Sequence, residues 1–159
     1  MTDKKLKSHR VKIDKIDKEI YALIQKRASH AVAIGKIKSK VSPKESFYKP
    51  DRETKILRNI LNANKKGLLP DSKIRAIYKE LISGCLSLEE ILKVAYLGPE
   101  ATHSEAAVHN QFGSQALRIP TSTIDDVFYQ VINDDVNLGV VPVENSSEGV
   151  INTTLNCLA

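Results

Sequence analysis

Apolar residues recur with a heptad period over the first forty positions and predict one long helix. One row of this pattern is Leu6, Ile13, Ile20, Arg27, Ile34 and Val41, and its companion row is His9, Ile16, Leu23, His30 and Ile37. Residues 6–41 contain no proline and only one glycine, Gly35. A helix of about 36 residues is about 54 Å long. Because that is too long for a lone compact domain of this size, we expect a partner chain or a coiled-coil arm.

Two shorter helices are predicted after a break that begins at Ser42-Pro43 and runs to Tyr48. Proline suits the first turn of a helix and acidic residues suit its positive end, so Pro50-Asp51-Arg52-Glu53 starts the second helix. We expect Gly67 to end it. A third helix opens at Pro70-Asp71-Ser72. Its apolar stripe is Ile74, Ile77, Tyr78, Leu81, Cys85, Leu88 and Leu92.

After Lys93 the pattern changes to short apolar runs that alternate with helical stretches. The expected strands are 94–97, 117–119 and 138–143. Thr102 or Ser104 can cap a helix that reaches about Phe112, and Thr123 can cap the next one. A last helical stretch follows Gly149. The order strand, helix, strand, helix, strand, helix predicts a parallel sheet.

Charge divides the 159-residue chain at the same place. The whole chain carries a formal net charge of +5, but residues 1–93 hold 23 basic and 11 acidic side chains, a net +12. Residues 94–159 hold one basic and eight acidic side chains, a net −7. This asymmetry predicts two units with different roles, residues 1–92 and residues 93–159.

Several classes of protein are excluded by composition. No apolar run approaches the ~20 residues of a membrane span. The charged start lacks the apolar core of a signal peptide, so we expect a cytoplasmic protein. Cys85 and Cys157 have no metal-ligand spacing and are expected to be reduced thiols. With three Phe and no Trp, stacking on nucleic-acid bases is not expected.

The unusual position of the long helix is Arg27, a charge within an apolar row. Such a charge is costly unless it is paired or faces a wet cavity. Lys38 lies 11 residues further on, within about 20° of the same direction and about 16 Å along the axis. The two cations are suited to clamp a compact polyanion. Arg10 points about 100° away from Arg27, so it could reach the equivalent pocket of a second copy.

Plainer interpretations exist for these charges. Arg27 could pair with an acidic residue across a dimer, and most lysines of the helix would form a solvated face. A heptad helix alone is more often structural than catalytic. The alternative function is therefore a non-enzymatic basic helical dimer that binds nucleic acid, with strong salt dependence, or a partner helix.

A set of short motifs in residues 6–92 resembles the all-helical chorismate mutase domain. In chain order they are Arg10, Ile13-xx-Ile16-Asp17, Leu23-Ile24-xx-Arg27, Gly35-Lys36-x-Lys38, Asp51-Arg52-Glu53 and Cys85-Leu86-x-Leu88-Glu89. Each is weak alone, and together they are specific. The resemblance implies three helices in an intertwined homodimer in which each site takes an arginine from the other subunit.

The resemblance also implies the chemistry, a pericyclic rearrangement of the dianion chorismate to prephenate, without cofactor or metal. The protein must hold the substrate in a chair-like shape and stabilise charge on the breaking ether oxygen. By this resemblance Arg10, from the partner chain, and Arg27 bind the carboxylates. Lys38 donates to the ether oxygen, Arg52 orients neighbouring groups, and Glu53 accepts the substrate hydroxyl.

Glu89 matches a position at which the family uses Gln or Glu as a second donor to the ether oxygen. A carboxylate cannot donate, so Glu89 would have to be protonated, and activity should fall toward alkaline pH. Without the resemblance, Glu89 would be a surface residue. Lys49 and Cys85 depart from the family pattern: Lys49 is a possible substrate contact, and Cys85, where other members have serine, is expected to pack rather than react.

Two stretches of the second unit, 95–104 and 140–149, resemble the first signature segments of prephenate dehydratase. This implies the start of a lobe like those of periplasmic binding proteins, in an enzyme of phenylalanine biosynthesis. The candidate residues of these loops are Thr102, Ser104, Glu144, Asn145 and Ser146. Strand ends and helix N-termini suit an anionic ligand, although helix caps and turns would explain the same residues.

Only about the first third of that domain is matched, so we expect a truncated chain with an active mutase half and an inactive dehydratase half. A regulatory mutase, activated by a partner protein that binds residues 94–159, is a third interpretation.

Overall fold

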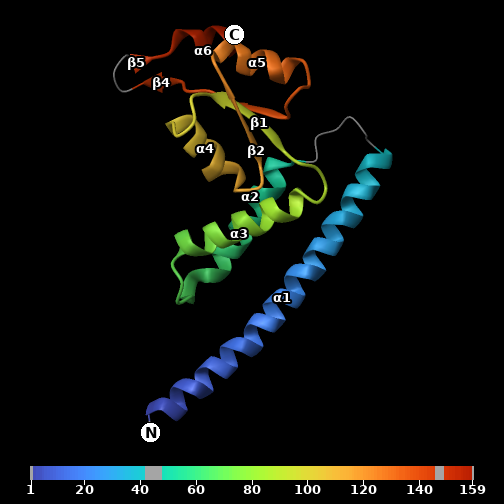
Figure 1. The fold of residues 1–159 in the computed structure, drawn as a ribbon, viewed down its shortest axis with the longest axis vertical. Coiled ribbons are helices and arrows are strands. Elements are labelled where there is room, and N and C mark those ends of the chain that lie inside the picture. Colours follow the sequence, from blue (N-terminus) through green and yellow to red (C-terminus); the bar gives the residue numbers. More distant parts are fainter. Residues whose placement is uncertain (1, 42–47, 146–148, 159) are drawn as a thin grey trace.

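The computed structural model describes residues 2–41, 48–145 and 149–158. Three helices come first in the chain, and a small sheet with further helices follows (Figure 1). We call residues 2–92 the helical region and residues 93–158 the α/β region. The predicted fold class, a helical unit followed by an α/β unit with a parallel sheet, is confirmed.

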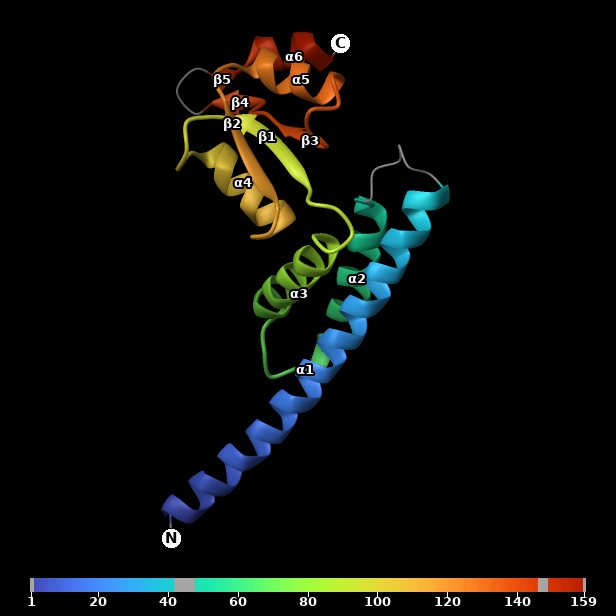
Figure 2. The ribbon, with the colours of Figure 1, turned by 45° about the vertical axis from the view of Figure 1, so that its right-hand side comes forward.

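Helix α1 (Thr2–Val41) is the predicted long helix and spans 40 residues. Its N-terminal half extends away from the rest of the chain in both views (Figures 1 and 2). As a result the apolar rows are open to solvent: Ile13 is 55% exposed, Ile16 53% and Leu23 65%. Among the described residues, no helix is long and apolar enough to cross a membrane.

Helices α2 (Pro50–Ala63) and α3 (Asp71–Leu86) pack on each other and lie beside the C-terminal half of α1. The predicted end of α2 at Gly67 was wrong, because a short turn, η1 (Asn64–Lys66), intervenes. The Asn64 side chain donates to the Leu69 carbonyl at 3.0 Å and to the Asp71 carboxylate at 2.7 Å. These bonds hold the connection between the two helices.

Helix α3 also ends earlier than its apolar stripe predicted. The helix stops at Leu86, and the Glu89 amide donates to the Leu86 carbonyl at 2.8 Å within a turn. Leu88 is 53% exposed, and Leu92 is buried in the core of the following sheet. The stripe therefore combined residues that serve two different cores. The predicted break over residues 42–47 lies outside the described residues.

The sheet of the α/β region has β1 (Lys93–Leu97) in its centre. Strands β2 (Leu117–Thr121) and β3 (Leu138–Val140) pair with β1 on either side, both parallel to it. Parallel strands need crossover connections, and α4 (His103–Phe112) and α5 (Ile124–Ile132) provide them.

Both crossover helices begin at the capping residues that the sequence predicted. The Thr102 hydroxyl accepts from the Glu105 amide, and the Thr123 hydroxyl accepts from the Asp126 amide. Such caps satisfy backbone amides that the first helical turn leaves without a partner. The sequence thus sets these two helix starts locally.

Alternation along β1 gives the α/β region two cores. Val94 and Tyr96 pack with Val108 of α4 on one face, and Ala95 packs with Val127 of α5 on the other. All five side chains are at most 1% exposed. The two helices therefore cover opposite faces of the sheet, which explains why consecutive residues of β1, Val94, Ala95 and Tyr96, are all buried.

The chain after β3 departs from the prediction. The strand ends at Val140 instead of Val143, and a hairpin of β4 (Glu144–Asn145) and β5 (Gly149–Val150) follows before α6 (Asn152–Leu158). Proline cannot donate to a ladder, and the Pro142 carbonyl instead accepts from the buried Thr154 hydroxyl at 2.7 Å. This contact was not readable from local sequence pattern.

Candidate active site

A cavity of about 580 Å³ lies between α1, α2, α3 and the turn after α3. Its lining includes seven of the eight residues predicted to contact or orient a substrate. These residues are Arg27, Lys38, Lys49, Arg52, Glu53, Cys85 and Glu89. They come from three helices and two connecting segments, so only packing brings them together. A pocket with four cations is suited to hold a small anion.

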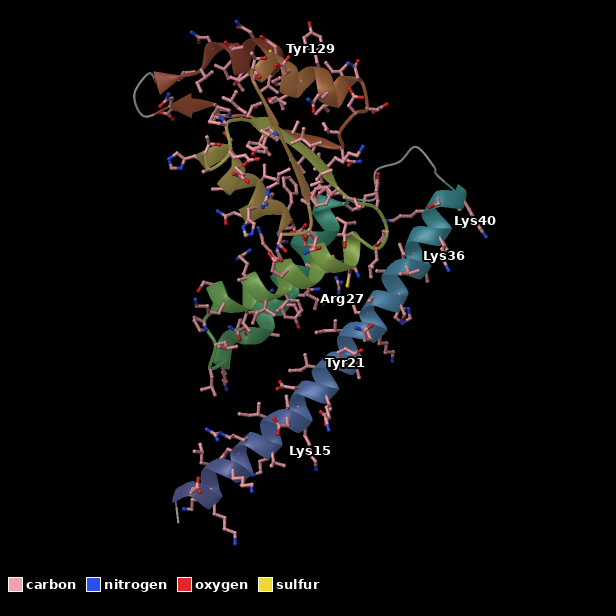
Figure 3. All side chains as sticks on the ribbon, viewed as in Figure 1. Lys15, Tyr21, Arg27, Lys36, Lys40 and Tyr129 are labelled. Carbon is pink, nitrogen blue, oxygen red and sulfur yellow. The ribbon has the colours of Figure 1, made fainter. Side chains whose placement is uncertain are left out.

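Arg27 lies on the side of α1 that faces α3, while Lys36 and Lys40 point away on the outer side (Figure 3). Its Nη1 donates to the Leu81 carbonyl of α3 at 3.3 Å. The half-buried guanidinium thus has a partner within its own chain and keeps further donors for a ligand, since arginine carries five N–H groups.

Lys38 and Glu89 form an ion pair in the pocket wall. The Lys38 ammonium donates to Glu89 Oε2 at 3.2 Å. The Glu89 side chain is only 11% exposed, which contradicts the plainer interpretation of Glu89 as a surface residue. The turn that holds Glu89 passes close to α1 at Gly35, where an added Cβ would lie 3.2 Å from Glu89 Cα. Glycine at this point of α1 therefore allows the close approach of the turn, which a side chain would push back by a few tenths of an ångström.

Glu53 is the second carboxylate of the pocket, on the first turn of α2. Burial raises the pKa of Glu53 above its ordinary value, while Lys79 and a hydrogen bond from Tyr48 act in the opposite direction. Burial also raises the pKa of Tyr48. The Tyr48 hydroxyl therefore remains a donor to the Glu53 carboxylate at neutral pH.

Part of the cavity lining was not predicted from the sequence. Tyr48, His30 and Leu86 line the same cavity. Tyr48 had a weak signal, an aromatic residue two positions before the proline that starts α2. The remaining unpredicted lining residues are apolar. They carry no local signal, because apolar residues at helical spacing occur at core positions of any helix. They are Ala31, Ile34, Ile56 and Ile82.

Cys85 lies in the same wall and is 5% exposed. It is free, as is the exposed Cys157. Its burial agrees with the expected packing role. Among the described residues no group of three or more His, Cys, Asp or Glu side chains is arranged to hold a metal ion.

Arg10 is the one predicted substrate contact that this pocket does not include. It is an exposed residue in the N-terminal half of α1. It lies 17 residues from Arg27, about 25 Å along the helix axis. A straight helix cannot fold back over that distance, so Arg10 cannot reach the pocket of its own chain.

The candidate loop residues of the α/β region are spread over several elements. Thr102 caps α4 and Ser104 lies in its first turn, whereas Glu144 and Asn145 form the exposed strand β4. Ser146 lies outside the described residues. The Thr102 hydroxyl accepts from the Glu105 amide and so caps α4, which is the alternative role that the sequence left open for Thr102.

Fold and pocket together define a class: a small helical domain with a cation-lined cavity, joined to a parallel α/β unit. Residues 9–90 match the family model of chorismate mutase type II, and residues 94–159 match that of prephenate dehydratase. The chain belongs to the chorismate mutase type II family.

Curated relatives carry both names. A bifunctional chorismate mutase/prephenate dehydratase from Stutzerimonas stutzeri is 44% identical over 154 residues, and one from Aquifex aeolicus is 47% identical over 154 residues. The Escherichia coli K12 protein of the same name is 26% identical over 165 residues. The matches cover 94–95% of this chain and 42% of each relative. The chain thus spans less than half the length of these relatives.

Proposed function

We propose that the helical region, residues 1–92, catalyses the rearrangement of chorismate to prephenate. The observation that carries this proposal is the single cavity into which Arg27, Lys38, Arg52, Glu53 and Glu89 converge. The reaction needs positioning and charge stabilisation rather than a nucleophile. A compact cavity with four cations and two half-buried carboxylates offers both.

The roles follow from the charges of substrate and pocket. Arg27 pairs with one carboxylate of the dianion in the bidentate way that guanidinium allows. Lys38 donates to the ether oxygen as the C–O bond breaks and negative charge grows there. Arg52 and Lys49, at the start of α2, line the opposite wall. Glu53 accepts the substrate hydroxyl, and Cys85 packs beneath the substrate.

Glu89 acts as a second donor to the ether oxygen in its protonated form. In the empty pocket its carboxylate accepts from Lys38. A bound dianion engages the Lys38 ammonium and places further negative charge beside Glu89. The role proposed for Glu89 is donation of a hydrogen bond, which an ionised carboxylate cannot perform.

The second carboxylate of the substrate is bound by Arg10 of a partner copy. Exposed apolar residues along the projecting part of α1 support this homodimer, since they would be buried against a second α1. The length of α1 has the same implication, because it carries Arg10 well beyond its own pocket. The partner is thus part of the site and not only of the assembly.

For the α/β region, residues 93–159, we propose a place in the prephenate dehydratase part of a phenylalanine-forming enzyme. Its match to that family model and the names of the relatives support this. The two free cysteines support a reducing, cytoplasmic location.

The shared site can be tested by mixing two inactive variants, Arg10→Ala and Lys38→Ala. Each alone should lose chorismate turnover. After subunit exchange, a mixed dimer has one site with both Lys38 and the partner's Arg10 intact, so about a quarter of the wild-type activity should return. Turnover is followed by loss of the chorismate diene absorbance.

Three results would contradict the proposal. Wild-type protein without turnover would exclude the mutase function. Variants that are inactive alone and stay inactive after mixing would exclude the shared site. Salt-sensitive DNA binding without turnover would instead favour the basic helical dimer.

A further inference from the structure

Two residues of the cavity wall, Tyr48 and Leu86, also pack on the core of the α/β region, and Tyr48 is the one with a polar group. The ring of Tyr48 meets the ring of Phe112, the last residue of α4, edge to face with centroids 5.5 Å apart and planes at 72°. Tyr48 also lines the cavity. Tyr48 is therefore shared by the pocket and by the core of the α/β region, on which Phe112 also packs.

A chain of hydrogen bonds runs through the same residue. The side-chain amide of Gln111 donates to the Tyr48 oxygen, and the Tyr48 hydroxyl donates to the Glu53 carboxylate. A hydroxyl that accepts one hydrogen bond becomes a better donor of the next, and its direction is set by both partners. Gln111 is exposed. Its amide therefore orients the Tyr48 hydroxyl but adds little to the buried surface.

The end of α4 that carries Gln111 is tied to the helical region. The Glu80 carboxylate of α3 accepts from the Ser114 hydroxyl and from its backbone amide at 3.2 Å, and the Ser83 hydroxyl accepts from the Gln115 amide at 3.3 Å. Gly113, at a φ of +78°, approaches Ser83 so closely that an added Cβ would lie 2.6 Å from its Cβ. Gln111 and Phe112 are thus held at a defined place beside α3.

We propose that Gln111 and Phe112 are positioning residues of the pocket, and that they orient the Glu53 carboxylate through Tyr48. This rests on the proposed mutase function. Phe112 sets the plane of the Tyr48 ring, and Gln111 turns its hydroxyl toward Glu53. Glu53 can then present a fixed lone pair to the substrate hydroxyl. The α/β region thereby takes part in the chemistry of the helical region without touching the substrate.

The consequence is a route by which the two regions influence each other. Any change that shifts the end of α4, such as a ligand held by the α/β region, would move Tyr48 and the acceptor on Glu53. The charged neighbour on α3, Lys79, is fixed in the same way, because its ammonium donates to the Asn110 carbonyl of α4. Lys79 and Tyr48, which both act on the Glu53 carboxylate, are thus both held by α4.

A double-mutant cycle with Gln111→Ala and Tyr48→Phe tests this route. Each single variant should lower kcat/KM for chorismate about three- to tenfold, the value of one lost hydrogen bond. The double variant should be no worse than Tyr48→Phe alone, because Gln111 acts only through the Tyr48 hydroxyl. Phe112→Leu should lower kcat/KM in the same direction.

The matched control is Asn110→Ala, which removes an exposed side-chain amide on the neighbouring position of α4 and keeps the backbone carbonyl that accepts from Lys79. This variant should leave kcat/KM within twofold of wild type. Losses that multiply in the double variant, or a Gln111→Ala enzyme equal to the control, would overturn the positioning role. Absence of turnover in the wild-type chain would overturn the proposed function and this inference together. If kcat/KM falls across these variants in proportion to their melting temperatures, Gln111 has a structural role and the positioning role is overturned.

Discussion

The two regions of the chain bury their apolar residues in different ways. The α/β region closes a core on each face of β1, with Val94, Tyr96 and Val108 almost wholly buried. The helical region has few buried apolar side chains, and its longest helix exposes Ile13, Ile16 and further residues of the same rows. One region is thus folded on itself, whereas the other exposes apolar rows of the kind that mark interaction surfaces, which is why we propose that a second copy covers them.

The same contrast holds for charge and function. In the helical region the cations of α1 and α2 meet in one cavity, where four of them face a shared space. In the α/β region the candidate residues are distributed among a helix cap, a helix turn and a hairpin strand. A binding site thus requires that the packing of several elements brings side chains into one cavity. Residues that match a family motif do not form a site by that match alone.

The largest expected effect is the loss of Lys38. Lys38→Ala removes the donor to the developing negative charge and leaves Glu89 without its partner, so kcat should fall about a hundred- to a thousandfold. Lys36→Ala, on the outer side of the same helix, is the matched control and should retain full activity. Equal losses in both variants would mean that the net charge of α1, and not the pocket, supports turnover.

The second effect concerns the exposed apolar rows. Ile20→Lys places a charge in the proposed α1–α1 contact, so the dimer should dissociate and turnover should fall about a hundredfold, because Arg10 no longer reaches a pocket. Size-exclusion chromatography with light scattering measures the change. The control is Lys18→Ala on the opposite side of the heptad. A monomeric wild-type protein with full activity would contradict the comparison of the two regions.

The third effect tests the closed core of the α/β region. Val94→Ala leaves a cavity beside Tyr96 and should lower the free energy of unfolding by about 2 kcal/mol. Chorismate turnover at low temperature should change less than threefold, since Val94 does not line the pocket. Thermal unfolding followed by circular dichroism, together with steady-state kinetics, separates the two. A large loss of turnover without a loss of stability would mean that the pocket depends on the packing of the α/β core more strongly than we infer.

The smallest effects are expected in the pH dependence of kcat/KM. Glu53 must be ionised to accept the substrate hydroxyl, and burial raises its pKa. Activity should therefore fall as the pH drops through that raised pKa, at a higher pH than for an ordinary glutamate. Glu89 must be protonated to donate, so activity should also fall toward alkaline pH.

Glutamine at either position removes one side of this profile. Glu53→Gln should flatten the acidic side and Glu89→Gln the alkaline side, with the other side kept in each case. The two variants are thus controls for each other. An unchanged alkaline side in Glu89→Gln would exclude its role as a proton-bearing donor.

Local sequence pattern predicted the elements well where a local cause exists. The uninterrupted heptads predicted α1, Pro50 predicted the start of α2, and Thr102 and Thr123 predicted the caps of α4 and α5. It was wrong where the chain turns for non-local reasons. Leu88 and Leu92 continue the apolar spacing of α3, but the helix stops at Leu86 and Leu92 is buried in the sheet core instead.

By itself the sequence determined the long amphipathic helix, the direction shared by Arg27 and Lys38, and the change in hydrophobic pattern and net charge near Lys93. These properties depend on helix periodicity and on residue type, which are local. Only the tertiary structure decided that Glu89 pairs with Lys38 and that Tyr48 links Glu53 to Gln111. Such contacts join residues far apart in sequence, and the packing of whole elements fixes them.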